Sequence, residues 1–86
     1  MRAAFAVLFC VVSSSALASP YCTPEPAAKW RAPDVMKDRV VAMGHHIDVF
    51  QTTKGNCYEV YGRDSAGKNI EIYFNPVTGE VVEDVK

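Results

Sequence analysis

The chain has no excess of basic residues and no long run of charge of one sign. Its nine Lys and Arg residues stand against ten Asp and Glu residues, a formal net charge of −1 over 86 residues. Proteins that bind nucleic acid through its phosphates carry a clear positive excess. The interspersed acids and bases are instead typical of a soluble surface, so nucleic acid is not an expected partner.

Residues suited to catalysis are also scarce. The two histidines are His45 and His46, and adjacent residues of a strand point to opposite faces, so at most one serves a given nucleophile or metal ion. Ser65 lies in a turn without a strand-to-helix elbow. Glu59 and Glu71 fall on strand positions that are typical of solvated cross-strand charge. We therefore expect no enzyme activity and no cofactor.

No hydrophobic run reaches the length of about 20 residues that spans a bilayer. Arg2 gives a positive start, residues 3–12 are apolar, and residues 16–18 form an A-x-A cleavage signal. This pattern predicts a secretory signal peptide over residues 1–18, and a periplasmic or secreted protein. A membrane anchor fits less well because serines shorten the run, and Cys10 lacks the small preceding residues of a lipid attachment site.

Cleavage near Ser19 leaves a mature chain of 68 residues, enough for one domain, which we expect to be a monomer without stable membrane insertion. The loss of Arg2 takes nine basic residues to eight against ten acidic ones, a net charge of −2. A chain of this size buries only about 60% of its unfolded surface. A cross-link would therefore help it to fold.

Cysteine is rare, and only Cys22 and Cys57 remain after cleavage. Two cysteines in an exported chain most often pair with each other. The closed loop of 36 residues, counting both ends, corresponds to about 3–4 kcal/mol of stabilisation in the chain-entropy model. Two free thiols and half of a metal site are the alternatives, but the spacing is far from C-x-x-C and neither cysteine has a histidine near it in sequence.

Residues 19–32 are predicted to form an extended arm, because closely spaced prolines exclude a helix or a central strand. A helix is predicted over residues 33–43. Pro33 suits its first turn, Asp34 complements the positive end of its dipole, and Gly44 is placed to stop it. Its narrow apolar face holds Met36, Val40 and Met43.

Four strands are predicted after the helix, joined by short turns rich in Gly, Asn and Asp. Ile47 and Val49 of the first strand share one face, and Phe50 falls on the other unless a bulge shifts it. The fold class is α+β, with one amphipathic helix packed on a four-stranded antiparallel meander sheet. The predicted strands cover residues 45–53, 57–61, 70–75 and 80–82.

Alternation along the strands assigns side chains to the two faces of the sheet. The aliphatic and aromatic set Ile70, Ile72 and Phe74 is the natural partner of the helical stripe. Cys57 and Tyr61 are thereby sent to the opposite face, which no helix covers, together with Tyr73. A disulfide would draw the arm across part of that face.

In this order the segments resemble a small exported PepSY domain, over about residues 30–82. The sharpest matches are Tyr58-Glu59-Val60 and the turn Asn-Pro-Val-Thr-Gly-Glu-Val at residues 75–81, where the family commonly has Asp-Pro-x-Thr-Gly-Glu and an aliphatic residue. Small members often carry one cysteine ahead of the helix and one before Tyr-Glu-Val, as this chain does. The departures are Asn in place of Asp at the start of the turn and the His-His pair after the helix. The PepSY-like domain is predicted over residues 33–86.

The resemblance implies a relation to the propeptide domains of thermolysin-like metallopeptidases, which chaperone or inhibit a peptidase, and it implies no catalytic residues. We expect a non-enzymatic exported binding module that modulates or inhibits a peptidase or another envelope protein. Two alternatives stay open. One is a structural or stress-related envelope protein without a peptidase target, and the other is a weak metal-binding protein that uses His45 and His46.

The candidate partner-binding residues are aromatic. Tyr61, Tyr73 and Phe50 are expected to form a patch on the helix-free face, and the short last strand offers an open edge as a second route. The competing interpretation is that the arm covers these aromatic side chains and that charged residues protect the edge.

The first prediction concerns the mature protein. The exported chain is expected to begin near Ser19 and to have an intact mass two hydrogens below its fully reduced value, because Cys22 and Cys57 pair. Mass spectrometry with thiol labelling before reduction checks both points. Retention of residues 1–18, or two thiols that react before reduction, contradicts the prediction.

Overall fold

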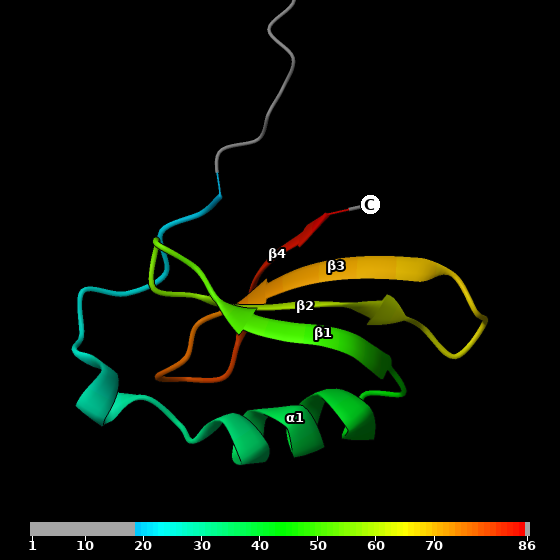
Figure 1. Ribbon diagram of the computed structural model, residues 1–86, viewed down its shortest axis with the longest axis horizontal. Helices are drawn as coiled ribbons and strands as arrows, with labels where there is room; N and C mark the ends of the chain where they lie inside the picture. Colours follow the sequence, from blue (N-terminus) through cyan, green and yellow to red (C-terminus); the bar gives the residue numbers. More distant parts are fainter. Residues whose placement is uncertain (1–18, 86) are drawn as a thin grey trace, which may run out of the picture.

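A single helix lies against one face of a four-stranded sheet. The computed structural model describes residues 19–85, so the predicted signal peptide lies outside the described residues. Neighbouring strands pair antiparallel in the order β1-β2-β3-β4, which confirms the meander and the α+β class (Figure 1). The elements are η1 (Ala27–Lys29), α1 (Pro33–Ala42), β1 (His46–Thr52), β2 (Tyr58–Arg63), β3 (Asn69–Phe74) and β4 (Val81–Val85).

Helix α1 begins and ends where the sequence predicts, to within one residue. Pro33 occupies its first position and Asp34 lies in the first turn. Gly44 follows the helix with a φ of 94°, a left-handed conformation that glycine adopts without a steric penalty. The Gly44 N–H donates to the Val41 carbonyl oxygen over 2.9 Å, which closes the last turn and redirects the chain into β1.

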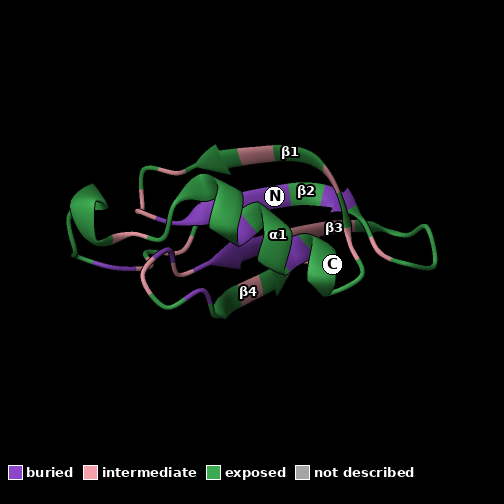
Figure 2. Cartoon of the chain, turned by 90° about the horizontal axis from the view of Figure 1, so that it is seen from below, coloured by how far each residue is buried: buried purple, intermediate pink, exposed green. Residues whose placement is uncertain are grey.

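The core lies between α1 and the sheet, and Figure 2 shows the helix crossing the buried centre of β2 and β3. Met36 and Val40 of the helix are fully buried there. The expectation that Met43 joins them is wrong, because Met43 lies beyond the helix end and its side chain is 45% exposed. The sheet contributes Tyr58, Val60, Ile72 and Phe74 to the same cluster.

Tyr58 contributes more to this core than its position in the sequence suggests. Its ring lies 5.6 Å from that of Trp30 and 4.9 Å from that of Phe50, measured between centroids. Its hydroxyl donates to the Arg31 carbonyl oxygen over 2.7 Å. A tyrosine buried with its hydroxyl bonded joins the sheet to the segment before α1 without leaving a polar atom unpaired.

A β-bulge at Asp48 changes which residues of β1 face the helix. The register with β2 shifts between Ile47 and Val49. Ile47 and Phe50 consequently both pack against the core, whereas Val49 is exposed. The expectation that Ile47 shares a face with Val49 is therefore wrong, because one extra residue inverts the alternation beyond it.

Strand β4 is longer than the predicted residues 80–82. It runs through Val81–Val85, with a second register shift opposite Tyr73 and Phe74. Glu83 and Asp84 have low intrinsic strand propensity, and pairing with β3 overrides it. The longer strand brings Val85 opposite Glu71.

The proline-rich arm, residues 19–32, is tied to the β1–β2 hairpin. Cys22 forms a disulfide with Cys57, as expected, and the Cys22 N–H donates to the Gly55 carbonyl oxygen over 2.8 Å. A Cβ atom at Gly55 would collide with the Pro20 carbonyl oxygen, so this close approach requires glycine. The arm passes around the end of the sheet from the helix-free side to the helix side (Figure 1).

The second prediction tests the core. Phe74→Ala is expected to lower the free energy of unfolding by about 3–5 kcal/mol, because Phe74 is fully buried between sheet and helix. Val41→Ala, at a helix position 58% exposed, is the matched control and is expected to change it by no more than about 0.5 kcal/mol. Denaturant titration measures both. Equal losses would show that the helix packs through another face.

Candidate functional site on the helix-free face of the sheet

The candidate site lies on the face of the sheet opposite α1, which we call the helix-free face. Because Val60 and Ile72 point into the core, the residues on either side of each point the other way. Strand pairing then sets two cross-strand rows on this face. One row is Gln51, Glu59, Tyr73 and Glu83, and the other is Val49, Tyr61, Glu71 and Val85.

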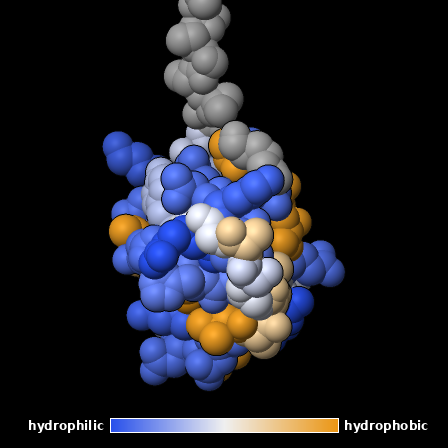
Figure 3. All heavy atoms as spheres, turned by 90° about the vertical axis from the view of Figure 1, so that its right-hand side faces the viewer, coloured by the Kyte–Doolittle hydropathy of each residue, from blue (hydrophilic) through white to orange (hydrophobic). Residues whose placement is uncertain are grey.

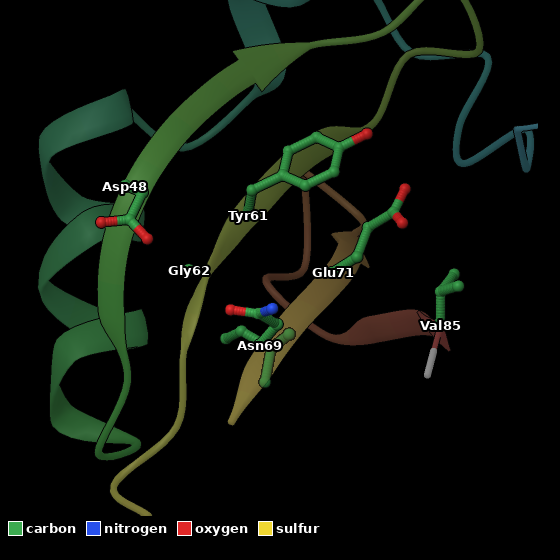
Figure 4. A pocket seen from close by; sticks show the side chains of 7 residues that line it. Asp48, Tyr61, Gly62, Asn69, Glu71 and Val85 are labelled. Carbon is green, nitrogen blue, oxygen red and sulfur yellow. The ribbon is translucent and has the colours of Figure 1, made fainter. Parts of the chain in front are cut away.

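A shallow hollow of about 340 Å³ opens on this face. Figure 4 shows Asp48 on one side, Glu71 and Val85 on the other, and Tyr61 and Asn69 between them. Gly62 and Ile70 complete its lining. A volume near 300 Å³ is at the small end for ligand pockets and suits one long side chain better than a cofactor.

The three aromatic residues predicted to bind a partner do not form one patch. Tyr61 lines the hollow and is 40% exposed. Tyr73 shares the helix-free face but is only 7% exposed, and Ser19 at the start of the arm lies within hydrogen-bonding reach of its hydroxyl. The expectation that Phe50 lies on this face is wrong, because the bulge at Asp48 turns Phe50 into the core, beside Tyr58.

Glu59 is the least expected residue on this face, since it is a carboxylate only 5% exposed. The Gln51 side-chain amide donates to its Oε1 atom over 3.0 Å, but Oε2 is buried without a hydrogen-bond partner. Burial raises the pKa of Glu59, but its polar neighbours, with the hydrogen bond from Gln51 first among them, outweigh burial and lower the pKa below its ordinary value. An ionised carboxylate is thus held beneath the surface.

The two tyrosines on this face are held in their neutral, hydrogen-donating form. Burial is the largest cause that raises the pKa of Tyr73 to about 12. The neighbouring Glu59 carboxyl is the largest cause that raises the pKa of Tyr61. The Tyr73 hydroxyl donates to Oε2 of Glu71 over 3.1 Å. Both hydroxyls therefore keep their protons beside neighbouring carboxylates.

Asp48 projects from the bulge at the other side of the hollow and is already paired. The Arg63 guanidinium donates to its Oδ1 atom over 3.2 Å, and His46 Nε2 lies 3.2 Å from the same oxygen. The hydrogen bond from Arg63 is the main reason that the pKa of Asp48 is lowered. All three side chains are exposed, so the pair orients Asp48 and contributes little to stability.

The two histidines diverge, and His45 lies just before β1, which begins at His46. His46 reaches Asp48, whereas the Nδ1 atom of His45 is buried without a partner at the end of α1. Within residues 19–85, no group of three or more His, Cys, Asp or Glu side chains is arranged to hold a metal ion. Over the same residues, no helix combines the length and apolar character needed to cross a membrane.

A helix on an antiparallel meander, with an arm fixed by a disulfide and a tyrosine-lined hollow, defines a small α+β module. The family model described as peptidase propeptide and YPEB domain, a PepSY family, matches residues 2–85. The chain therefore belongs to this family. Proteins of this family are propeptide- and inhibitor-like modules that are generally non-catalytic. Neither the curated proteins nor the solved structures contain a significant match.

Most of the residues that line the hollow are not predicted from the sequence. Asp48 and Val85 line it because of the bulge in β1 and the length of β4, and neither feature is explicit in the sequence pattern. The imperfect alternation from Ile47 to Phe50 was the only available signal of the bulge. The sequence predicts that Glu71 is a solvated charge, whereas the register of β2 and β3 places it opposite Tyr61.

The third prediction follows from Tyr73. The folded state binds its phenolic proton more tightly than the unfolded state does, so the resulting stability is complete below about pH 10 and is lost as the pH rises to about 12. Tyr73→Phe removes the titrating group and is expected to flatten this decline. Denaturant titrations across the window measure it. Parallel declines for the native protein and the variant contradict the assignment.

Proposed function

We propose that the protein is a non-enzymatic, exported binding module that modulates or inhibits a peptidase or another envelope protein through the helix-free face. The observation that carries the proposal is the hollow beside Tyr61, on a sheet face that α1 leaves uncovered. Membership of the peptidase propeptide and YPEB domain family supports a peptidase-related partner.

Tyr61 is the residue through which we expect this face to bind. Tyrosine supplies a large contact area with few rotatable bonds and is enriched where interfaces concentrate their energy. The Tyr61 side chain is 40% exposed and borders the hollow, so a partner reaches it without any rearrangement of the core. Tyr73 has a supporting role, because it lies under the arm and bonds Glu71.

Other parts of the surface are weaker candidates for a binding interface. The end of the molecule that carries the β2–β3 turn is largely hydrophilic, with hydrophobic residues in small separate groups (Figure 3). The outer edge of β4 is the second route, since Val81 and Val82 are exposed there. Glu83 and Asp84 on the same strand are charges of the kind that discourage edge pairing.

The proposed location outside the cytoplasm is supported by the disulfide. Structural disulfides form and persist in oxidising compartments such as the periplasm and the extracellular space. Cys22 and Cys57 are paired, and a disulfide in a member of this family fits an extracellular or periplasmic protein. A structural or stress-related envelope role is the alternative function, and it requires no peptidase target.

The fourth prediction tests the proposed face. The mature protein, immobilised and incubated with envelope extract, is expected to capture a defined partner, and Tyr61→Ser is expected to abolish that capture while leaving most of the stability intact. If the captured protein is a peptidase, its activity is expected to fall on addition of the native protein and not of the variant. Capture identified by mass spectrometry and a peptidase assay provide the two measurements.

Tyr21→Ser is the matched control, because Tyr21 is an exposed tyrosine on the arm, outside the hollow. This variant is expected to capture the partner normally. Normal capture by Tyr61→Ser would instead move the interface to the β4 edge. Capture of no partner by the native protein would favour the structural role.

A further inference from the structure

Negative charge on the helix-free face is not balanced by the side chains around it. Glu59, Glu71 and Glu83 occupy the central and last strands of this face. Arg63 is the one lysine or arginine among the described residues of the two rows and their neighbours on this face. Its guanidinium is paired with Asp48. The negative charge that no basic side chain neutralises therefore lies on the glutamates.

Glu59 and Glu71 form the centre of this charge. Their residues are diagonal neighbours on adjacent strands, with both side chains on the helix-free face. Two ionised carboxylates on neighbouring strands repel each other, and a cation beside them removes that repulsion. The structure thus holds a carboxyl pair that a bound cation would stabilise.

The buried Oε2 atom of Glu59 is a second reason to expect a cation near Glu71. Its Oε2 atom has no hydrogen-bond partner, and the residue is only 5% exposed. The neighbours that Glu59 contacts include Tyr61 and Glu71, and both of these line the hollow. A buried ionised oxygen without a donor is unfavourable, and a positive charge brought to this wall of the hollow would offset part of that cost.

The shape of the hollow selects the kind of cation. Val85 gives it an aliphatic wall, Tyr61 an aromatic one, and Glu71 a carboxylate at its rim (Figure 4). Lys and Arg side chains combine an apolar stem with a charged end. The stem fits the apolar walls, and the charged end is attracted both to the carboxylate and to a tyrosine ring.

We propose that the hollow receives a lysine or arginine side chain from an extended segment of the protein partner, with its cationic group bound by Glu71 against Tyr61. Glu59 lies beneath the surface, outside the lining of the hollow, and adds negative charge behind Glu71. This inference rests on the proposed function and names the chemistry of the partner. An acidic partner side chain would meet like charge here, and an apolar one would leave the carboxyl pair uncompensated.

Peptide binding followed by NMR tests the inference without knowledge of the partner. Short blocked peptides with one central arginine or lysine in an alanine background are titrated into the 15N-labelled mature protein. The arginine and lysine peptides are expected to shift the amide signals of Tyr61, Glu71 and Val85. The same peptide with citrulline, a neutral analogue of arginine, is expected to leave them unchanged, and ionic strength near 1 M is expected to weaken binding because it screens the charges.

Two matched variants locate the charge. Glu71→Gln keeps an acceptor for the Tyr73 hydroxyl but removes the charge, and it is expected to weaken binding of the arginine peptide by about fivefold to tenfold. Glu80→Gln makes the same change at an exposed carboxylate outside the hollow and is expected to bind with unchanged affinity. Amide spectra without peptide show whether each variant is folded.

Several outcomes overturn the inference. Equal shifts with the citrulline peptide would mean that charge is not recognised, and equal saturation by free arginine would mean a small-molecule site in place of a docking site for a protein segment. Absence of shifts with every peptide also overturns it. The proposed function fails separately, because it is judged by whether Tyr61→Ser loses capture of the natural partner.

Discussion

The disulfide between Cys22 and Cys57 is the constraint on which the rest of the arrangement depends. It holds an arm with no strand of its own against the start of β2, where Gly55 leaves room for the Pro20 carbonyl group. The start of the arm thereby lies beside the Tyr73 hydroxyl on the helix-free face. Its far end leads into α1 on the other side of the sheet (Figure 1). One covalent link therefore helps to hold the arm where it covers part of the helix-free face.

The single helix makes the two faces of the sheet chemically different. On the side of α1, buried aliphatic and aromatic side chains form the core, with the Tyr58 hydroxyl bonded to the backbone. The other side carries carboxylates, neutral tyrosines and a hollow. Because so small a domain has only one helix with which to bury a sheet face, the second face must remain polar or be covered by something else. In this chain the arm covers part of it, and the part around Tyr61 is left open.

The fold followed from the sequence wherever a local rule was strong. Pro33 and Gly44 set the ends of the helix, and the turns between hydrophobic runs set the meander. The errors arose where pairing between strands overrides local preference. The imperfect alternation of β1 allows a bulge but does not place it at Asp48, and this bulge moves Phe50 into the core. The family could be predicted from the order of its segments, but the hollow could not, since it depends on the bulge and on the register of β4.

The placement of Glu59 is the strongest physical argument that the helix-free face is used for binding. An ionised carboxylate beneath the surface costs free energy, and a leucine or valine at that position of the strand would avoid the cost. The Gln51 amide compensates one oxygen, and the second is left without a donor beside another carboxyl group. Such an arrangement does not improve folding, which favours a role for this face in binding. The lysine or arginine side chain that we propose for the hollow would place a positive charge beside these carboxyl groups, and it leaves the core beneath the sheet undisturbed.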